Sequence, residues 1–290
     1  MSSKQEQNKR LGVVLEGGAL RGLFSAGVID ALMELDIMPD GVVGVSAGAA
    51  FGCNYKSQQP GRVIRYNKRL AHDWRYCSLR SWLTTGDLFG SEFCYHTLPD
   101  ELDLFDTATF DASPMEFYAV CTDVLTGRPV YKLLMHHSRE CYDWIRASAS
   151  MPIASKIVEI NGQKLLDGGV TDSIPLSFFE QQGYKRNIVV LTQPRGYRKK
   201  PNPLLPLIRI SLRKYPAFVQ AMNRRHLMYN QQLDHVFAEE KAGHAFVILP
   251  EDNLGIGHTS HDPDEMQHTY DLGRKAVEQC RGALEAFIAR

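Results

Sequence analysis

Gly44-Val45-Ser46-Ala47-Gly48 is the stretch around which the chain is organised. Val42 and Val43 precede it, and a run of small residues that can form a helix continues to Ala50. This context predicts a strand, a sharp turn and a helix. A serine on such a turn occupies a strained backbone position that exposes its hydroxyl. The flanking glycines are needed where a Cβ would collide with a neighbouring strand or helix. An ordinary turn rich in small residues is the alternative.

A second glycine cluster lies upstream, at Glu16-Gly17-Gly18-Ala19-Leu20-Arg21-Gly22. It follows the apolar run 11–15 and precedes a helical pattern over 23–35. Strand, helix and strand within about 35 residues predict a βαβ unit, and hence a parallel sheet with a right-handed crossover. Two glycine turns then lie at one sheet edge. One would supply a nucleophile, and the other the backbone N–H groups of an oxyanion hole.

Asp167 is the candidate general base, because a serine hydroxyl becomes a good nucleophile only when a base takes its proton. It ends the second arm of a hairpin that Asn161-Gly162 predicts, and two glycines follow it. Glycines at this point allow another backbone, such as the Ser46 turn, to come close. A plain turn is the alternative interpretation.

The remaining pattern predicts one domain over residues 1–290. Its motif-bearing core is about 11–192, and the C-terminal part, 193–290, completes or decorates that core. Segment 77–93 is either a cap over a pocket or irregular packing over the core. Further strands are expected at 116–122, 129–134, 157–160, 163–166, 187–192 and 245–249, and helices at 62–74, 141–150 and 264–288.

Four motifs in this order resemble the patatin-like phospholipase family, over about residues 11 to 175, and Ile174-Pro175 is also similar to the family. The C-terminal third, from about Thr192, shows no motif of that family. The four are Gly17-Gly18-Ala19-Leu20-Arg21-Gly22, Gly44-Val45-Ser46-Ala47-Gly48, Ala147-Ser148-Ala149-Ser150-Met151-Pro152 and Asp167-Gly168-Gly169.

The resemblance implies an α/β fold with three α/β/α layers and a mostly parallel central sheet. It also implies a serine acyl hydrolase that cleaves lipid acyl esters through a Ser–Asp dyad and an acyl-enzyme, with Ser46 as nucleophile and Asp167 as base. The amides of Gly17, Gly18 and Ala19 match the oxyanion hole, with Arg21 at the position of its basic residue. Family members usually have a third glycine where this chain has Ala19. This chemistry requires no metal and no cofactor.

The composition limits the binding partners and the cellular location that can be expected. The formal net charge is zero, so nucleic acid is not an expected partner. Six scattered cysteines are typical of reduced thiols in a cytoplasmic protein. Residues 1–10 are polar and contain no apolar region of a secretory signal. No apolar run approaches the ~18–20 residues of a membrane span.

A basic stretch in the C-terminal third suggests peripheral contact with a membrane. Arginines and lysines over 195–225 alternate with apolar residues, and 207–228 is predicted to form a basic amphipathic helix. Such a helix over about 204–228 can lie on an anionic membrane. The alternative is a solvated helix whose apolar stripe joins the core.

Three other functions compete with the dyad. A Ser-His-Asp esterase would use His258 or His261, because the order serine, acid, histidine fits α/β-hydrolases. Against it, Ser46 lies early for that fold and the upstream loop is not His-Gly-Gly. A nucleotide-binding module is disfavoured, because the glycine loop lacks the phosphate-binding signatures. A non-catalytic acyl-binding regulatory protein is the third alternative.

Overall fold

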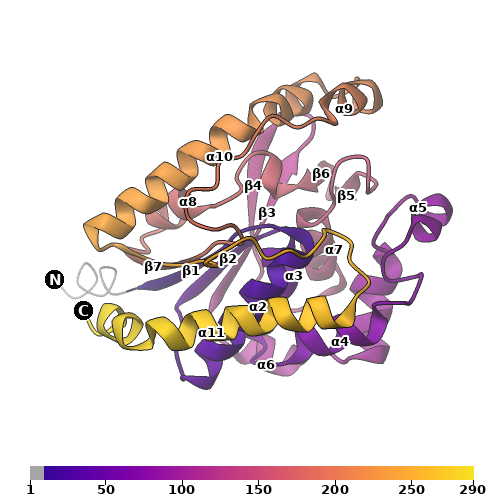
Figure 1. Ribbon diagram of the computed structural model, residues 1–290. Helices are drawn as coiled ribbons and strands as arrows, with labels where there is room; N and C mark the ends of the chain where they lie inside the picture. The colour runs from indigo at the N-terminus through magenta and orange to yellow at the C-terminus, as the bar shows by residue number, and fades with distance from the viewer. Residues whose placement is uncertain (1–9) are drawn as a thin grey trace.

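Eight strands form one sheet in the computed structural model, which describes residues 10–290 (Figure 1). Residues 1–9, most of the segment in which no secretory signal is expected, lie outside the described residues. The strands are β1 (Leu11–Leu15), β2 (Gly41–Val45), β3 (Glu116–Asp123), β4 (Arg128–Leu133), β5 (Val158–Ile160), β6 (Gln163–Asp167), β7 (Arg186–Val190) and β8 (Ala245–Ile248). Their pairing follows β5-β6-β3-β2-β1-β7-β8, with β4 also paired to β3. All pairs among β1, β2, β3, β7 and β8 are parallel, so the mostly parallel sheet is confirmed.

Helices cover both faces of this sheet and complete the predicted α/β/α layers. Figure 1 shows α2, α3, α4 and α11 below the sheet, and α8 and α10 above it. The helices are η1 (Ala19–Arg21), α2 (Gly22–Glu34), α3 (Ala47–Lys56), α4 (Arg62–Leu70), α5 (Leu79–Thr85), the π-helix η2 (Phe93–Leu102), α6 (Thr107–Ala112), α7 (Arg139–Ser148), η3 (Gly168–Val170), α8 (Leu176–Gln181), α9 (Leu205–Ser211), α10 (Pro216–Ala242) and α11 (Pro263–Ile288).

The apolar strands follow from burial on both sides. In β1, Val13 and Leu15 belong to the cluster shared with α2 and α3, whereas Val14 belongs to the cluster shared with α8 and α10. A strand covered on both faces needs apolar residues throughout instead of alternation. The run 11–15 therefore reads as a continuous apolar segment.

The C-terminal third packs directly on the first βαβ unit. β8 extends the sheet by pairing with β7. Helix α11 crosses α2 with their backbones in contact, since a Cβ on Gly27 would lie 2.0 Å from the Tyr270 oxygen and one on Gly273 2.0 Å from the Phe24 oxygen. We infer from these contacts that the C-terminal third folds with the core as one unit.

Two local predictions need correction. The single helix expected over 207–228 is wrong: α9 ends at Ser211 and α10 begins at Pro216, a residue that lacks an N–H and therefore starts helices. The helix expected over 62–74 ends at Leu70. Within residues 10–290, the helices are either too short or too polar to cross a bilayer.

Candidate active site

Ser46 stands on the strained turn that its flanking glycines predict. It has φ 55° and ψ −122°, and α3 begins at the next residue, so the helix N-terminus adds positive potential beside it. A Cβ on Gly44 would lie 2.3 Å from the Gly48 oxygen, and one on Gly48 would lie 2.5 Å from the Leu15 oxygen. A larger residue at position 44 would therefore push α3 away from the turn, and one at position 48 would push β1 away.

The upstream glycine loop lies against this turn. A Cβ on Gly17 would be 3.0 Å from the Ser46 Cβ, and one on Gly18 would be 2.7 Å from the Thr192 hydroxyl. Within residues 10–290, the amides of Gly17, Gly18 and Ala19 have no hydrogen-bond acceptor. Ala19 has φ 49°, a left-handed conformation that favours glycine, so the substitution noted in the sequence falls on a strained residue.

Strand register brings Asp167 to Ser46. β4 pairs with β3 along 118–123, so β2 and β6 must share the other edge of β3. β2 ends with Val45 opposite Val120, and β6 arrives from the opposite direction and ends with Asp167 opposite Cys121. The residue after Val45 and the last residue of β6 therefore meet end to end.

The backbone and carboxylate of Asp167 are held by several hydrogen bonds. Its N–H donates to the Ser150 oxygen at 2.8 Å, and its carbonyl accepts from the Thr122 hydroxyl at 2.8 Å. Its Oδ1 accepts from the Gly169 N–H at 2.7 Å. Burial raises the pKa of Asp167, while the charge of Arg225 and hydrogen bonds from Ser46 and Gly169 oppose that rise. A carboxylate with a raised pKa is a stronger base than one in water.

Ser148 also supports the turn, and sequence reasoning missed its role. Its Oγ accepts from the Ser46 N–H at 3.0 Å and donates to the Val120 oxygen at 2.6 Å. The sequence pointed only to tight packing of the small residues 147–150. A hydroxyl buried among alanines was the available signal, because buried polar groups are nearly always hydrogen-bonded.

Two cavities open at Ser46. The first, which we call the apolar cavity, has a volume of about 110 Å³ and is bounded by α3, α7 and η2. Its lining includes Leu20, Phe51, Tyr95, Leu98, Phe105 and Met151. Segment 77–93, for which the sequence left a cap over a pocket and irregular packing as alternatives, contributes Phe89 to this lining. A cavity with such a lining favours an apolar ligand group.

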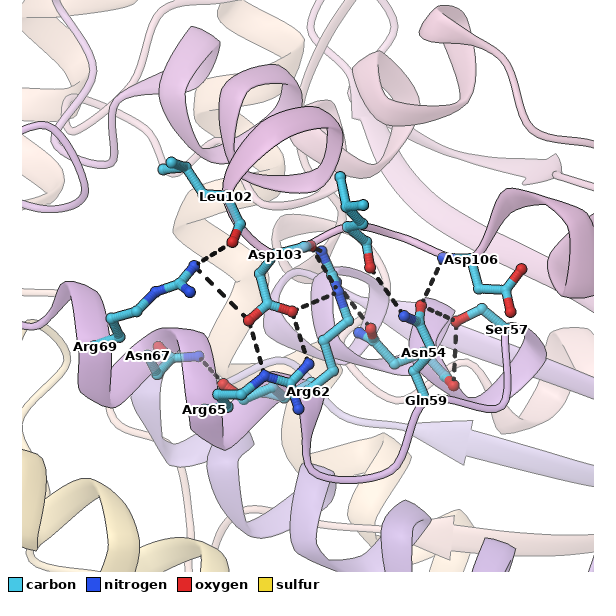
Figure 2. Close-up of polar contacts among 12 residues, drawn as sticks. Asn54, Ser57, Gln59, Arg62, Arg65, Asn67, Arg69, Leu102, Asp103 and Asp106 are labelled. Atoms are coloured by element: carbon cyan, nitrogen blue, oxygen red, sulfur yellow. Dashed lines mark hydrogen bonds and ion pairs between the residues drawn. The ribbon is translucent and has the colours of Figure 1, made fainter.

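Figure 2 shows the polar network behind this cavity, centred on Asp103 directly after η2. Arg65 binds both Asp103 carboxylate oxygens, at 2.8 and 2.9 Å. Arg62 contacts the Asp103 carbonyl and donates to Asn54 at 2.9 Å. The Arg62 and Asp103 side chains are 5% and 4% exposed, so this pair is desolvated. The network ties the end of η2 to α3 and α4 and thereby fixes one wall of the apolar cavity.

The second cavity, which we call the polar cavity, has a volume of about 170 Å³. It contains every site residue that the sequence predicted: Gly17, Gly18, Ala19, Arg21, Ser46 and Asp167. It also contains Lys199, Arg225, Tyr229 and His258 from the C-terminal third, which sequence reasoning did not assign to the dyad's surroundings.

The two candidate histidines have different surroundings. His258 lines the polar cavity, and its Nε2 lies 2.7 Å from the Arg21 guanidinium. Because a guanidinium only donates, this nitrogen accepts and carries no proton. Burial and the charges of Arg21, Lys199 and Arg225 lower the pKa of His258. The Nδ1 of His261 instead lies 2.6 Å from the Ala71 oxygen, outside the lining of the polar cavity.

A group that could ligate a metal lies away from both cavities. Glu180, His235 and Glu239 each offer one ligand atom within 4.8 Å of the others. His235 already pairs with Glu180 at 2.8 Å, and Glu239 pairs with His244 at 2.8 Å. None of these residues lines the polar cavity.

Comparison with known proteins places the chain in a family. A family model described as patatin-like phospholipase matches residues 13–179, and a domain of unknown function, DUF6363, matches 215–289. An uncharacterised protein of Escherichia coli K12, YjjU, is 30% identical over 67% of this chain and 55% of its own length. The lysophospholipase nte1 of Aspergillus oryzae is 30% identical over 60% of this chain and 11% of its own length. The chain thus spans about half of the first relative and about a tenth of the second.

Among solved structures, VipD of Legionella pneumophila matches with a TM-score of 0.44 and 12% identity, over 93% of this chain and 67% of that one. The family model covers more than half of the described residues and includes the Ser46 turn, the glycine loop and Asp167. The chain belongs to the patatin-like phospholipase family.

Proposed function

We propose that this chain is a serine acyl hydrolase that cleaves lipid acyl esters through Ser46 and Asp167. The observation that supports this most is the meeting of three parts in one cavity: a serine on a strained turn, a buried carboxylate and a loop whose amides find no hydrogen-bond acceptor within residues 10–290. The relatives named lysophospholipases favour a lipid ester as the substrate class.

In the proposed reaction, Asp167 accepts the hydroxyl proton as the Ser46 Oγ attacks the ester carbonyl carbon. The amides of Gly17, Gly18 and Ala19 donate to the developing oxyanion, an effect of about 3–4 kcal/mol per donor in comparable enzymes. The tetrahedral intermediate expels the alcohol, which takes the proton from Asp167, and leaves an acyl-enzyme. Water then gives its proton to Asp167, attacks the acyl carbon and releases the fatty acid, returning the proton to Ser46.

The apolar cavity favours an acyl group as its occupant, because it begins at Ser46 and its lining, apart from Arg62, is mostly aromatic and aliphatic. We place the acyl chain there and the alcohol part of the ester in the polar cavity. Ser46, Ala19 and Met151 line both cavities, so an ester bond at Ser46 would stand at their junction.

Helix α9 is the segment that we propose for peripheral contact with an anionic membrane. Leu204, Leu207 and Ile210 are exposed, and so are the neighbouring Arg209 and Arg213. Neutralising Arg209, Arg213 and Lys214 together is expected to weaken binding to anionic vesicles in a sedimentation assay. Unchanged vesicle binding would exclude this surface. The six free thiols agree with the cytoplasmic location that we propose.

The test of the reaction is acyl release from phospholipids, lysophospholipids and short-chain esters by wild type, Ser46→Ala and Asp167→Asn. We expect both variants to lose at least about a thousandfold in kcat. A fluorophosphonate probe should label wild type and fail to label Ser46→Ala. Absence of both turnover and labelling in folded wild type would favour the acyl-binding alternative.

His258→Ala and His261→Ala distinguish the dyad from a Ser-His-Asp triad. Because His258 accepts from Arg21 and has a lowered pKa, we expect its variant to stay far more active than Asp167→Asn. A loss in His258→Ala as deep as that in Ser46→Ala would assign the base to the histidine.

A further inference from the structure

Three cationic side chains from separate parts of the chain converge in the polar cavity. Arg21 comes from the glycine loop, whereas Lys199 and Arg225 come from the C-terminal third. Within residues 10–290, none of the three has a carboxylate within 4.0 Å. The Arg21 Nε is buried and has no hydrogen-bond partner there. Unpaired cations in a partly desolvated hollow are costly unless an anion joins them.

The cations are held in place by contacts that leave donors free. One Arg21 nitrogen binds His258, and the Arg225 Nε donates to the Gly169 oxygen at 2.5 Å. The Lys199 backbone makes two hydrogen bonds with Asn230, at 2.8 and 3.1 Å. Its ammonium lies 4.4 Å from the centre of the Tyr229 ring. The remaining guanidinium N–H groups and the ammonium are therefore preorganised for a ligand.

The carboxylates of the cavity are already engaged elsewhere. Glu16 accepts from the Tyr229 hydroxyl at 2.7 Å through one oxygen and from the Thr192 N–H at 2.6 Å through the other. Asp167 accepts from Gly169. Burial and the nearby Arg225, partly offset by Glu16, lower the pKa of Lys199 to about 8. The carboxylates of the cavity therefore relieve the mutual repulsion among the cations only in part.

We propose that Lys199 and Arg225, together with Arg21, bind a phosphate group on the alcohol part of the substrate. Guanidinium and ammonium donors from separate elements match the several oxygens of a phosphate better than the single plane of a carboxylate. The proposal rests on the function proposed above, because it places the acyl chain in the apolar cavity and the phosphate in the polar one. It makes the C-terminal third the source of headgroup selection.

The test compares two monomeric substrates with the same acyl chains, so that membrane binding plays no part. They are a dihexanoyl glycerophospholipid below its micelle concentration and neutral dihexanoylglycerol. The quantity measured is the ratio of their kcat/KM values. We expect Lys199→Gln and Arg225→Gln each to lower this ratio by about tenfold to a hundredfold, the effect of one charge-assisted hydrogen bond. Lys199→Arg should largely restore it.

Lys200→Gln and Arg224→Gln are matched controls, since both residues are exposed sequence neighbours that do not line the cavity. They remove the same charges and should keep the wild-type ratio. If the wild type cleaves both substrates and all four Gln variants keep the wild-type ratio of kcat/KM values, the phosphate site is overturned and the hydrolase stands. If the wild type cleaves neither and is not labelled by a fluorophosphonate, the hydrolase itself fails.

A binding experiment separates a headgroup from free phosphate and requires no turnover. Glycerol phosphate and inorganic phosphate are titrated calorimetrically into Ser46→Ala protein, with and without Lys199→Gln. We expect glycerol phosphate to bind more tightly than inorganic phosphate, and Lys199→Gln to weaken it about tenfold or more. Equal affinity for the two ligands, or binding that Lys199→Gln leaves unchanged, would overturn the assignment to a substrate headgroup.

Discussion

Removing the Ser148 hydroxyl tests whether its hydrogen bond to the Ser46 N–H positions the nucleophile. In Ser148→Ala the Ser46 N–H loses its acceptor and the Val120 carbonyl loses a donor. Ser148 is fully buried, so water cannot easily replace it. An unsatisfied buried donor costs about 1–3 kcal/mol. The strained φ of Ser46 costs a similar ~1–3 kcal/mol, and it persists only while the surroundings enforce it.

These terms set the expected size of the effect on catalysis. If about 2 kcal/mol is lost from positioning of the Ser46 hydroxyl in the transition state, kcat falls about 30-fold. KM should change little, because Ser148 lines neither cavity. The free energy of unfolding should also fall, by about 1–3 kcal/mol.

The assay is steady-state hydrolysis of a soluble short-chain ester, with urea unfolding of the same preparations. Ser150→Ala is the matched control, because within residues 10–290 its hydroxyl donates only to the Arg146 oxygen of the preceding helix α7, at 2.8 Å, and the Ser150 carbonyl that holds Asp167 is kept. We expect Ser150→Ala to stay near wild type. If folded Ser148→Ala has the same kcat as Ser150→Ala, the hydrogen bond to Ser46 does not position the nucleophile and the reasoning is refuted.

Three further predictions follow from strain, burial and charge. Ala19→Gly should raise the free energy of unfolding by about 0.5–1 kcal/mol in urea, because relief of ~1–2 kcal/mol of left-handed strain exceeds the entropy cost of glycine; a lower urea midpoint would contradict this. Asp103→Asn should lower the free energy of unfolding by about 3–5 kcal/mol, because it removes the negative charge beside buried Arg62 while leaving Arg62 its hydrogen bonds to the Asp103 carbonyl and Asn54, and a thermal midpoint equal to wild type would argue against that. Because the folded pKa of Asp167 is raised above 3.8, its stabilising contribution is complete below the unfolded pKa and is lost as pH rises through the folded pKa. Asp167→Asn should therefore be more stable than wild type at pH 7, and the acid limb of the wild-type kcat profile should lie above the ordinary carboxyl range; equal stability at pH 7 would count against a raised pKa.

Local chemistry made most of the motif-bearing half predictable. The glycines around Ser46 are dictated by backbone contacts within one βαβ unit, and Asn161-Gly162 forms its turn with φ values of 50° and 79°. Both signals depend on residues close in sequence. The order of the four motifs then pointed to a family that the comparisons confirm. The catalytic roles of Ser46 and Asp167 stay predictions.

Only the tertiary structure decided what surrounds that pair. The end-to-end meeting of β2 and β6 depends on how three strands share the edges of β3, which no single segment specifies. Lys199 and Arg225 belong to the basic stretch that suggested membrane contact, and His258 to a loop considered for a triad, but no local pattern predicts that the three line one cavity. The break between α9 and α10 is marked locally by Pro216, but that Ile208 and Phe218 on either side of it share one cluster is seen only in the fold. Side chains that act together across long sequence separations leave no periodic signal, so their assembly is set by the fold alone.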